Sequence, residues 1–159
     1  TDLMNLSTLG FRGEALASIA AVARLSIISG GWKMRASITE DHIIEQVAAT
    51  EGTIVQSEGL FENFPARRVF LKRAATEGVM CKNTFIEKTL SRPDIAFRFV
   101  NDGETKIDLP ANQSLKERFI AANSYKEDKS LFFELESVQL SENPDWSFKV
   151  VIGEPAVSR

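Results

Sequence analysis

The first third of the chain combines one apolar run with several short alternating stretches. Residues 14–23 are apolar on nearly every side and rich in Ala and Leu, which predicts a buried helix. Short β-branched stretches with turn residues between them follow, and they predict strands at residues 24–29, 32–38, 42–48 and 52–57. We therefore expect one helix packed against a small meander.

The pattern changes after Gly59. Pro65 stands near a predicted helix start, where its missing N–H costs little. Residues 76–90 predict a longer helix that ends before Pro93. These signals predict a helical stretch between two groups of strands.

Turn and capping residues organise the remainder. Apolar and polar residues alternate within residues 95–109 on either side of Asn101-Asp102-Gly103, and this pattern predicts a hairpin. Ser114 and Glu117 have the spacing of a capping box at the start of a helix over residues 114–122. Two further antiparallel strands are predicted at residues 130–140 and 145–153, around Asn143-Pro144.

Composition excludes several classes of protein. The 159 residues are 43% hydrophobic and 26% charged, which is typical of a globular chain. With 19 basic and 22 acidic residues the net charge is −3, so bulk electrostatic binding of nucleic acid is not expected, although local basic patches remain possible. No apolar run approaches the length of a membrane span, so we expect no membrane association. The single cysteine, Cys81, and the single histidine, His42, predict neither an internal disulfide nor a metal site.

The stretch STLGFRGEAL, residues 7–16, has two readings. Gly10 and Gly13 precede a helix, and a helix start offers unpaired backbone N–H groups to an anion such as phosphate. Arg12 would add a cationic donor. A plain turn, with Glu14 placed favourably on the helix dipole, explains the same residues.

A second candidate segment, residues 60–73, is apolar and basic. Its four aromatic or branched residues predict an apolar anchor, and its cations crowd one short predicted helix. The apolar residues are Phe61, Phe64, Val69 and Phe70, and the cations are Arg67, Arg68, Lys72 and Arg73. Neutralisation by carboxylates, exposure to solvent or contact with a phosphate backbone would each offset their mutual repulsion. Locally, the Gly52-Thr53 step predicts only a turn and an edge hydroxyl.

Together these stretches resemble the N-terminal ATPase region of the MutL family of DNA mismatch-repair proteins. The strings GFRGEAL (residues 10–16) and NFPARR (residues 63–68) occur in the family's order, and the resemblance covers essentially the whole chain. It implies an α/β (α+β) fold. Residues 1–57 would be the C-terminal part of a GHKL ATPase α/β sandwich. Residues 58–159 would be part of a ribosomal protein S five domain two-like transducer subdomain with a left-handed βαβ crossover.

The resemblance also implies a nucleotide site. The loop of Gly10, Phe11, Arg12 and Gly13, with Glu14, would lie against the triphosphate of ATP, and Thr53 would help to hold the adenine. The family's catalytic glutamate, its Mg²⁺-binding asparagine and its Asp-x-Gly-x-Gly segment precede the first of these motifs and are absent from this sequence. We therefore expect no catalytic or metal-binding residue here, and Glu14 does not fill the vacant role.

Two positions depart from the family pattern. Gly59 stands where many relatives have Asp, and Glu62 stands where Tyr is common. The sequence alone offers no functional reason for either change.

We therefore expect an interior fragment of a MutL-type protein. The parent would bind and hydrolyse ATP with Mg²⁺, form a self-dimer through its N-terminal domain, and work with mismatched duplex DNA and a MutS-type mismatch recognition protein. It would couple mismatch recognition to strand incision and unwinding in the bacterial cytoplasm, associated with the nucleoid during repair. Many relatives also carry a metal-dependent endonuclease domain. The fragment itself is expected to be inactive and to hold no nucleotide tightly.

The alternative is a non-catalytic module for DNA binding or self-association. For DNA binding, the candidate residues are Arg67, Arg68, Lys72 and Arg73.

Overall fold

The computed structural model describes residues 14–137 and 147–157, and the chain divides into two compact units. Unit 1 comprises Thr1–Leu71 and unit 2 comprises Lys72–Arg159. The sequence places a boundary between residues 57 and 58, where two subdomains of the family would meet. The division into compact units does not test that boundary, which stays a prediction.

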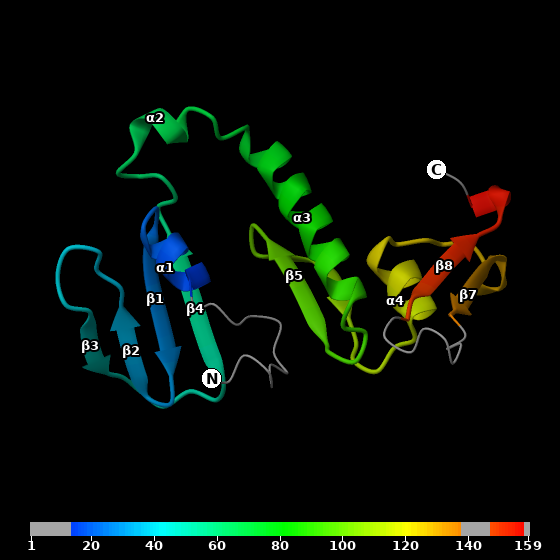
Figure 1. Cartoon of the computed structure of the whole chain (residues 1–159), viewed down its shortest axis with the longest axis horizontal. Coiled ribbons are helices and arrows are strands. Elements are labelled where there is room, and N and C mark those ends of the chain that lie inside the picture. The colour runs from blue at the N-terminus through cyan, green and yellow to red at the C-terminus, as the bar shows by residue number, and fades with distance from the viewer. Residues whose placement is uncertain (1–13, 138–146, 158–159) are drawn as a thin grey trace. The chain divides into compact units, whose positions relative to one another are not determined.

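Unit 1 contains an antiparallel four-stranded sheet with the strand order β3-β2-β1-β4 (Figure 1). Its elements are α1 (Glu14–Ala20), β1 (Arg24–Ser29), β2 (Trp32–Arg35), β3 (Ile43–Gln46), β4 (Thr53–Glu58) and α2 (Pro65–Arg68). The first three strands form the predicted meander. The fourth does not extend it, because β4 returns to the free edge of β1.

Helix α1 lies on one face of this sheet. Leu25 and Ile27 point to that face, and Leu25 is buried there. The expected burial of the helix itself is wrong, because Leu16 and Ile19 remain 41% and 38% exposed. In the described part of the chain the sheet covers only one side of α1, whereas its residues are apolar on nearly every side.

Among its described residues, unit 2 contains two α-helices and two separate antiparallel strand pairs. Its elements are α3 (Ala74–Leu90), β5 (Phe97–Asn101), β6 (Glu104–Leu109), α4 (Leu115–Ala122), β7 (Phe132–Glu136) and β8 (Lys149–Gly153), with short 3₁₀ turns at Lys129–Leu131 and Pro155–Val157. The expected mixed α/β class is confirmed. A βαβ crossover joins parallel strands, and the described strand pairs are antiparallel, so the left-handed crossover stays a prediction.

The local signals in unit 2 are confirmed. Asp102 and Gly103 both have positive φ, 52° and 77°, as a two-residue hairpin turn requires. Ser114 Oγ accepts a hydrogen bond from the backbone N–H of Glu117 at 3.1 Å, and Glu117 Oε2 accepts one from the N–H of Ser114 at 3.0 Å. The predicted turn at Asn143-Pro144 lies outside the described residues.

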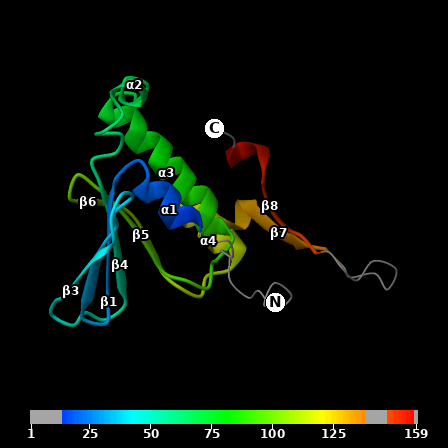
Figure 2. The same ribbon diagram turned by 60° about the vertical axis from the view of Figure 1, so that its left-hand side comes forward.

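Two small hydrophobic clusters stabilise unit 2, and the second view shows α3 running along the β5–β6 pair (Figure 2). The first cluster joins α3, the β5–β6 pair and α4 around Leu109 and Ala122. The second joins α4 to the β7–β8 pair around Ile120 and Phe132. Helix α4 therefore contributes to both clusters and connects the two strand pairs.

Candidate functional site

Most of the predicted phosphate loop lies outside the described residues. This applies to Gly10, Phe11, Arg12 and Gly13, whose role in nucleotide binding stays a prediction. Glu14 is described, and it is the exposed first residue of α1. A helix therefore begins directly after the Gly-x-x-Gly stretch, as the sequence predicts.

Thr53 opens the edge strand β4 and faces Ser29, the last residue of β1. The two residues are direct partners in the antiparallel register. Their hydroxyl oxygens, Thr53 Oγ1 and Ser29 Oγ, are 3.0 Å apart, and both residues are exposed. Sequence reasoning missed Ser29, because only the return of β4 to β1 brings the two hydroxyls together.

The hydroxyl pair and α1 occupy the same face of the sheet. Side chains alternate along a strand, so Ser29 points to the same side as Leu25 and Ile27, which lie under α1. A hydroxyl group offers one donor and two acceptor lone pairs, which suits the mixed donor and acceptor edge of a purine base. The exposed hydroxyl pair can therefore both donate and accept hydrogen bonds on the face of the sheet that carries α1.

The described residues do not supply a metal centre. In residues 14–137 and 147–157, no group of three or more His, Cys, Asp or Glu side chains is arranged to hold a metal ion. His42 Nδ1 accepts a hydrogen bond from the backbone N–H of Ser37 at 3.3 Å, which makes it a loop histidine, and Cys81 is an exposed free thiol.

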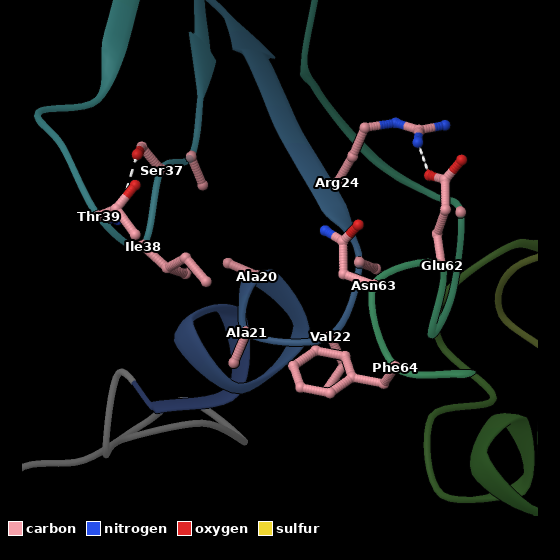
Figure 3. Close-up of a pocket in the computed structure, with 13 residues that line it drawn as sticks. Ala20, Ala21, Val22, Arg24, Ser37, Ile38, Thr39, Glu62, Asn63 and Phe64 are labelled. Carbon is pink, nitrogen blue, oxygen red and sulfur yellow. Dashed lines mark hydrogen bonds and ion pairs between the residues drawn. The ribbon is translucent and has the colours of Figure 1, made fainter. Parts of the chain in front are cut away.

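A pocket of about 240 Å³ lies at the other end of unit 1, between the end of α1, the loop after β2 and the segment after β4 (Figure 3). The side chains of Arg24 and Glu62 form an ion pair beside it, and Phe64 lies next to Val22. Gly59 has φ +63°, and a Cβ built there would lie 2.5 Å from Glu62 Oε2 and 2.9 Å from Arg24 Nη1.

Glu62 pairs with Arg24, and Gly59 leaves room for both side chains. A larger residue at position 59 would meet these two side chains and would have to adopt a positive φ.

The basic segment does not form the single short helix that the sequence predicts. Helix α2 ends at Arg68, and Arg73 is the N-cap of α3, so Arg67 and Arg68 belong to unit 1 whereas Lys72 and Arg73 belong to unit 2. All four cations are exposed. The N–H of Val69 still bonds to the carbonyl oxygen of Pro65, but those of Phe70 and Leu71 bond three residues back, and the helix does not continue.

The predicted apolar anchor is also wrong for three of its four residues. Phe64, Val69 and Phe70 are 39%, 81% and 84% exposed, whereas Phe61 is half-buried. The segment therefore presents apolar as well as basic side chains at the surface of this chain.

Carboxylates do not neutralise these cations within the part of the chain that the structure describes, where none of the four forms an ion pair with Asp or Glu. The guanidinium carbon of Arg67 lies 5.7 Å from the centre of the Phe64 ring. The backbone N–H of Lys72 donates to Glu77 Oε1 at 2.8 Å. The four cations are therefore exposed to solvent, with the Phe64 ring beside that of Arg67.

Comparisons of sequence and of structure with known proteins find relatives of the same kind. The chain is 38% identical to the DNA mismatch repair protein MutL of Treponema pallidum over 99% of its own length, and 38% identical to that of Heliobacterium modesticaldum, again over 99%. The Aquifex aeolicus MutL ATPase domain complexed with ADP is structurally similar, with a TM-score of 0.67 and 28% identity over 79% of this chain. No family model matches the chain.

The chain spans only part of these relatives. It covers 28% of the Treponema protein, 24% of the Heliobacterium protein and 52% of the Aquifex domain. Among the described residues, no helix is long and apolar enough to cross a membrane.

Proposed function

Because this chain belongs to the MutL family of DNA mismatch-repair proteins, we propose that it forms part of the nucleotide-binding region of a mismatch-repair ATPase. The observation that carries the proposal is 38% identity over 99% of the chain. Similarity to a MutL ATPase domain complexed with ADP supports nucleotide binding. The exposed Thr53–Ser29 hydroxyl pair, on the sheet face that carries α1, supports a contact with the base.

In this proposal the loop from Gly10 to Gly13 and the start of α1 at Glu14 hold the phosphates. The unpaired backbone N–H groups at the helix start donate to phosphate oxygens, and the side chain of Arg12 adds a charged donor. Thr53 contacts the adenine directly or through water. Mg²⁺ neutralises the triphosphate and takes its protein ligands from outside this chain.

The intact protein would use nucleotide binding as a switch. Contacts with the γ-phosphate order the surrounding loops, and hydrolysis releases them, which shifts the population between two conformations. The ATP-bound form would dimerise through the N-terminal domain. That form would couple mismatch recognition by a MutS-type protein to strand incision and unwinding on duplex DNA, in the bacterial cytoplasm at the nucleoid.

The 159-residue chain alone should not hydrolyse ATP. In the family, the glutamate that activates water and the asparagine that binds Mg²⁺ precede the GFRGEAL motif, and this sequence contains neither. The test is to measure ATP hydrolysis and ADP affinity for the intact protein and for the 159-residue chain. Hydrolysis by the intact protein alone would support the proposal. Absence of ADP binding by the intact protein, or turnover by the purified chain, would contradict it.

A second candidate function is DNA binding or self-association without catalysis. The observation in its favour is the exposure of Arg67 and Arg68 without a carboxylate partner in the described residues. Phosphate oxygens of a DNA backbone would supply the missing negative charge. Exposed apolar residues such as Phe70 would suit contact with a second copy.

A further inference from the structure

We propose that Ser29 is a positioning residue for base recognition, and that it acts by holding the hydroxyl of Thr53 in one orientation. The inference rests on the proposed function, because it assumes that Thr53 contacts the base of a bound nucleotide. It assigns a role to a residue that the sequence motifs do not include.

The backbone holds Ser29 firmly on two sides. On one side it pairs with Thr53 in the β1–β4 register. On the other side it pairs with Trp32 across a two-residue turn, in which Gly30 and Gly31 have φ +56° and +88°. The position of Ser29 Cβ is therefore set by the sheet, and Ser29 Oγ lies on the same face as Thr53.

Thr53 is paired on one side only in the described sheet, where it is the first residue of the edge strand β4. Its exposed side chain has staggered rotamers available to it. The 3.0 Å contact between Thr53 Oγ1 and Ser29 Oγ favours the rotamer in which this hydrogen bond forms. Before a ligand binds, this contact already restricts the side chain, which reduces the entropy that binding must remove.

The contact leaves Thr53 able to bind a base. If Ser29 donates its proton to Thr53 Oγ1, the Thr53 proton is free to donate to a ring nitrogen. If Thr53 donates to Ser29 Oγ, the Thr53 oxygen keeps lone pairs that accept from an exocyclic amine. Either way, loss of the Ser29 hydroxyl weakens a contact with the base and leaves contacts with the phosphates unchanged.

The experiment compares two ligands on the intact protein, ADP and inorganic tripolyphosphate. Ser29→Ala should weaken ADP binding about threefold to tenfold, the effect of one hydrogen bond, and should leave tripolyphosphate binding unchanged. Ser29→Thr keeps the hydroxyl and should restore ADP affinity. Ser26→Ala is the matched control, because Ser26 lies on the same strand with its side chain on the opposite face. Circular dichroism checks that each variant is folded.

A double-mutant cycle tests whether Ser29 acts through Thr53. In a Thr53→Ala background, Ser29→Ala should have no further effect on ADP affinity. Three results would overturn the inference: unchanged ADP affinity in Ser29→Ala, equal losses for ADP and tripolyphosphate, or a full additional loss in the Thr53→Ala background. If Thr53→Ala weakens ADP binding and Ser29→Ala does not, only the role of Ser29 fails. If the wild-type intact protein does not bind ADP, the proposed function fails, and the inference about Ser29 fails with it.

Discussion

The guanidinium of Arg118 on α4 donates a hydrogen bond from Nη2 to the backbone carbonyl oxygen of Ile95, at 2.7 Å. The same nitrogen lies 2.9 Å from the carbonyl oxygen of Pro93 and 2.8 Å from that of Pro110. The side chain is completely buried, and this burial lowers the pKa of Arg118, while the charge of Asp94 acts in the opposite direction. Arg118 thereby ties the segment before β5 and the end of β6 to α4.

Replacing Arg118 should destabilise unit 2. Arg118→Met keeps a long side chain but leaves buried carbonyl oxygens without their donor, so we expect the free energy of unfolding to fall by about 2–4 kcal/mol. Arg98→Met is the matched control, because Arg98 is 64% exposed and pairs with Asp108 at the surface. Its effect should stay below about 1 kcal/mol. Urea denaturation followed by circular dichroism measures both, and equal losses would contradict the role assigned to Arg118.

The ion pair of Arg24 and Glu62 should respond to a carboxylate at position 59. Glu62→Gln should lower the free energy of unfolding by up to about 1 kcal/mol, because the pair is largely exposed. In that background Gly59→Asp places a carboxylate beside Arg24 but at φ +63°, so it should cost less stability than an aspartate at another positive-φ glycine that lies away from Arg24.

Gly52→Asp is the matched control for backbone strain. Gly52 also has positive φ, 76°, but a Cβ there meets nothing within 4 Å. Thermal melting of the single and double variants measures both effects. Equal losses from the two aspartates would rule out an interaction of residue 59 with Arg24.

The stability of the chain should fall in acid partly through Asp94. Hydrogen bonds from Arg92 lower the pKa of this carboxyl below its ordinary value of 3.8. A pKa lowered in the folded state means that ionised Asp94 contributes stability above the unfolded pKa, and that this contribution is lost as pH falls through the folded pKa. Hydrogen bonds from Lys106 and from the backbone of Ser130 lower the pKa values of Glu104 and Asp128 in the same way.

The urea midpoint should therefore decrease as pH falls below about 4. Asp94→Asn removes one of the three groups, so its midpoint should decrease less steeply over the same range. An identical pH profile for Asp94→Asn and the wild type would contradict the assignment.

Charge reversal should reveal whether α2 binds DNA. Arg67→Glu combined with Arg68→Glu should weaken binding to duplex DNA and lower the magnitude of the slope of log Kd against log salt by up to about 2, one for each lost phosphate contact. The control, Lys126→Glu with Lys129→Glu, changes the net charge equally at exposed positions in unit 2. Fluorescence anisotropy with a labelled duplex measures the slopes. If both double variants behave alike, net charge and not α2 governs binding.

Local signals in the sequence predicted local structure well. The hairpin at Asp102-Gly103 and the capping box of Ser114 and Glu117 each depend on residues within a few positions of one another, and both are confirmed. Their physical causes, a positive φ and a reciprocal pair of hydrogen bonds, act within one turn.

Features that depend on distant residues were not predicted. The contact of Ser29 with Thr53 requires β4 to return to β1, and the burial of Arg118 requires three carbonyl oxygens from two other segments. A phenylalanine is usually buried, so the exposure of Phe70 is decided by which other segments pack around it. In each case tertiary contacts decide, and hydrophobic periodicity carries no information about them.

The central claim is that this chain contributes a base contact and a phosphate loop to one nucleotide site. The most direct test is a crystal structure of the intact protein with a non-hydrolysable ATP analogue. The account predicts that backbone N–H groups of residues 10–13 lie within hydrogen-bonding distance of phosphate oxygens, and that the base lies at Thr53. A nucleotide bound away from both would contradict it.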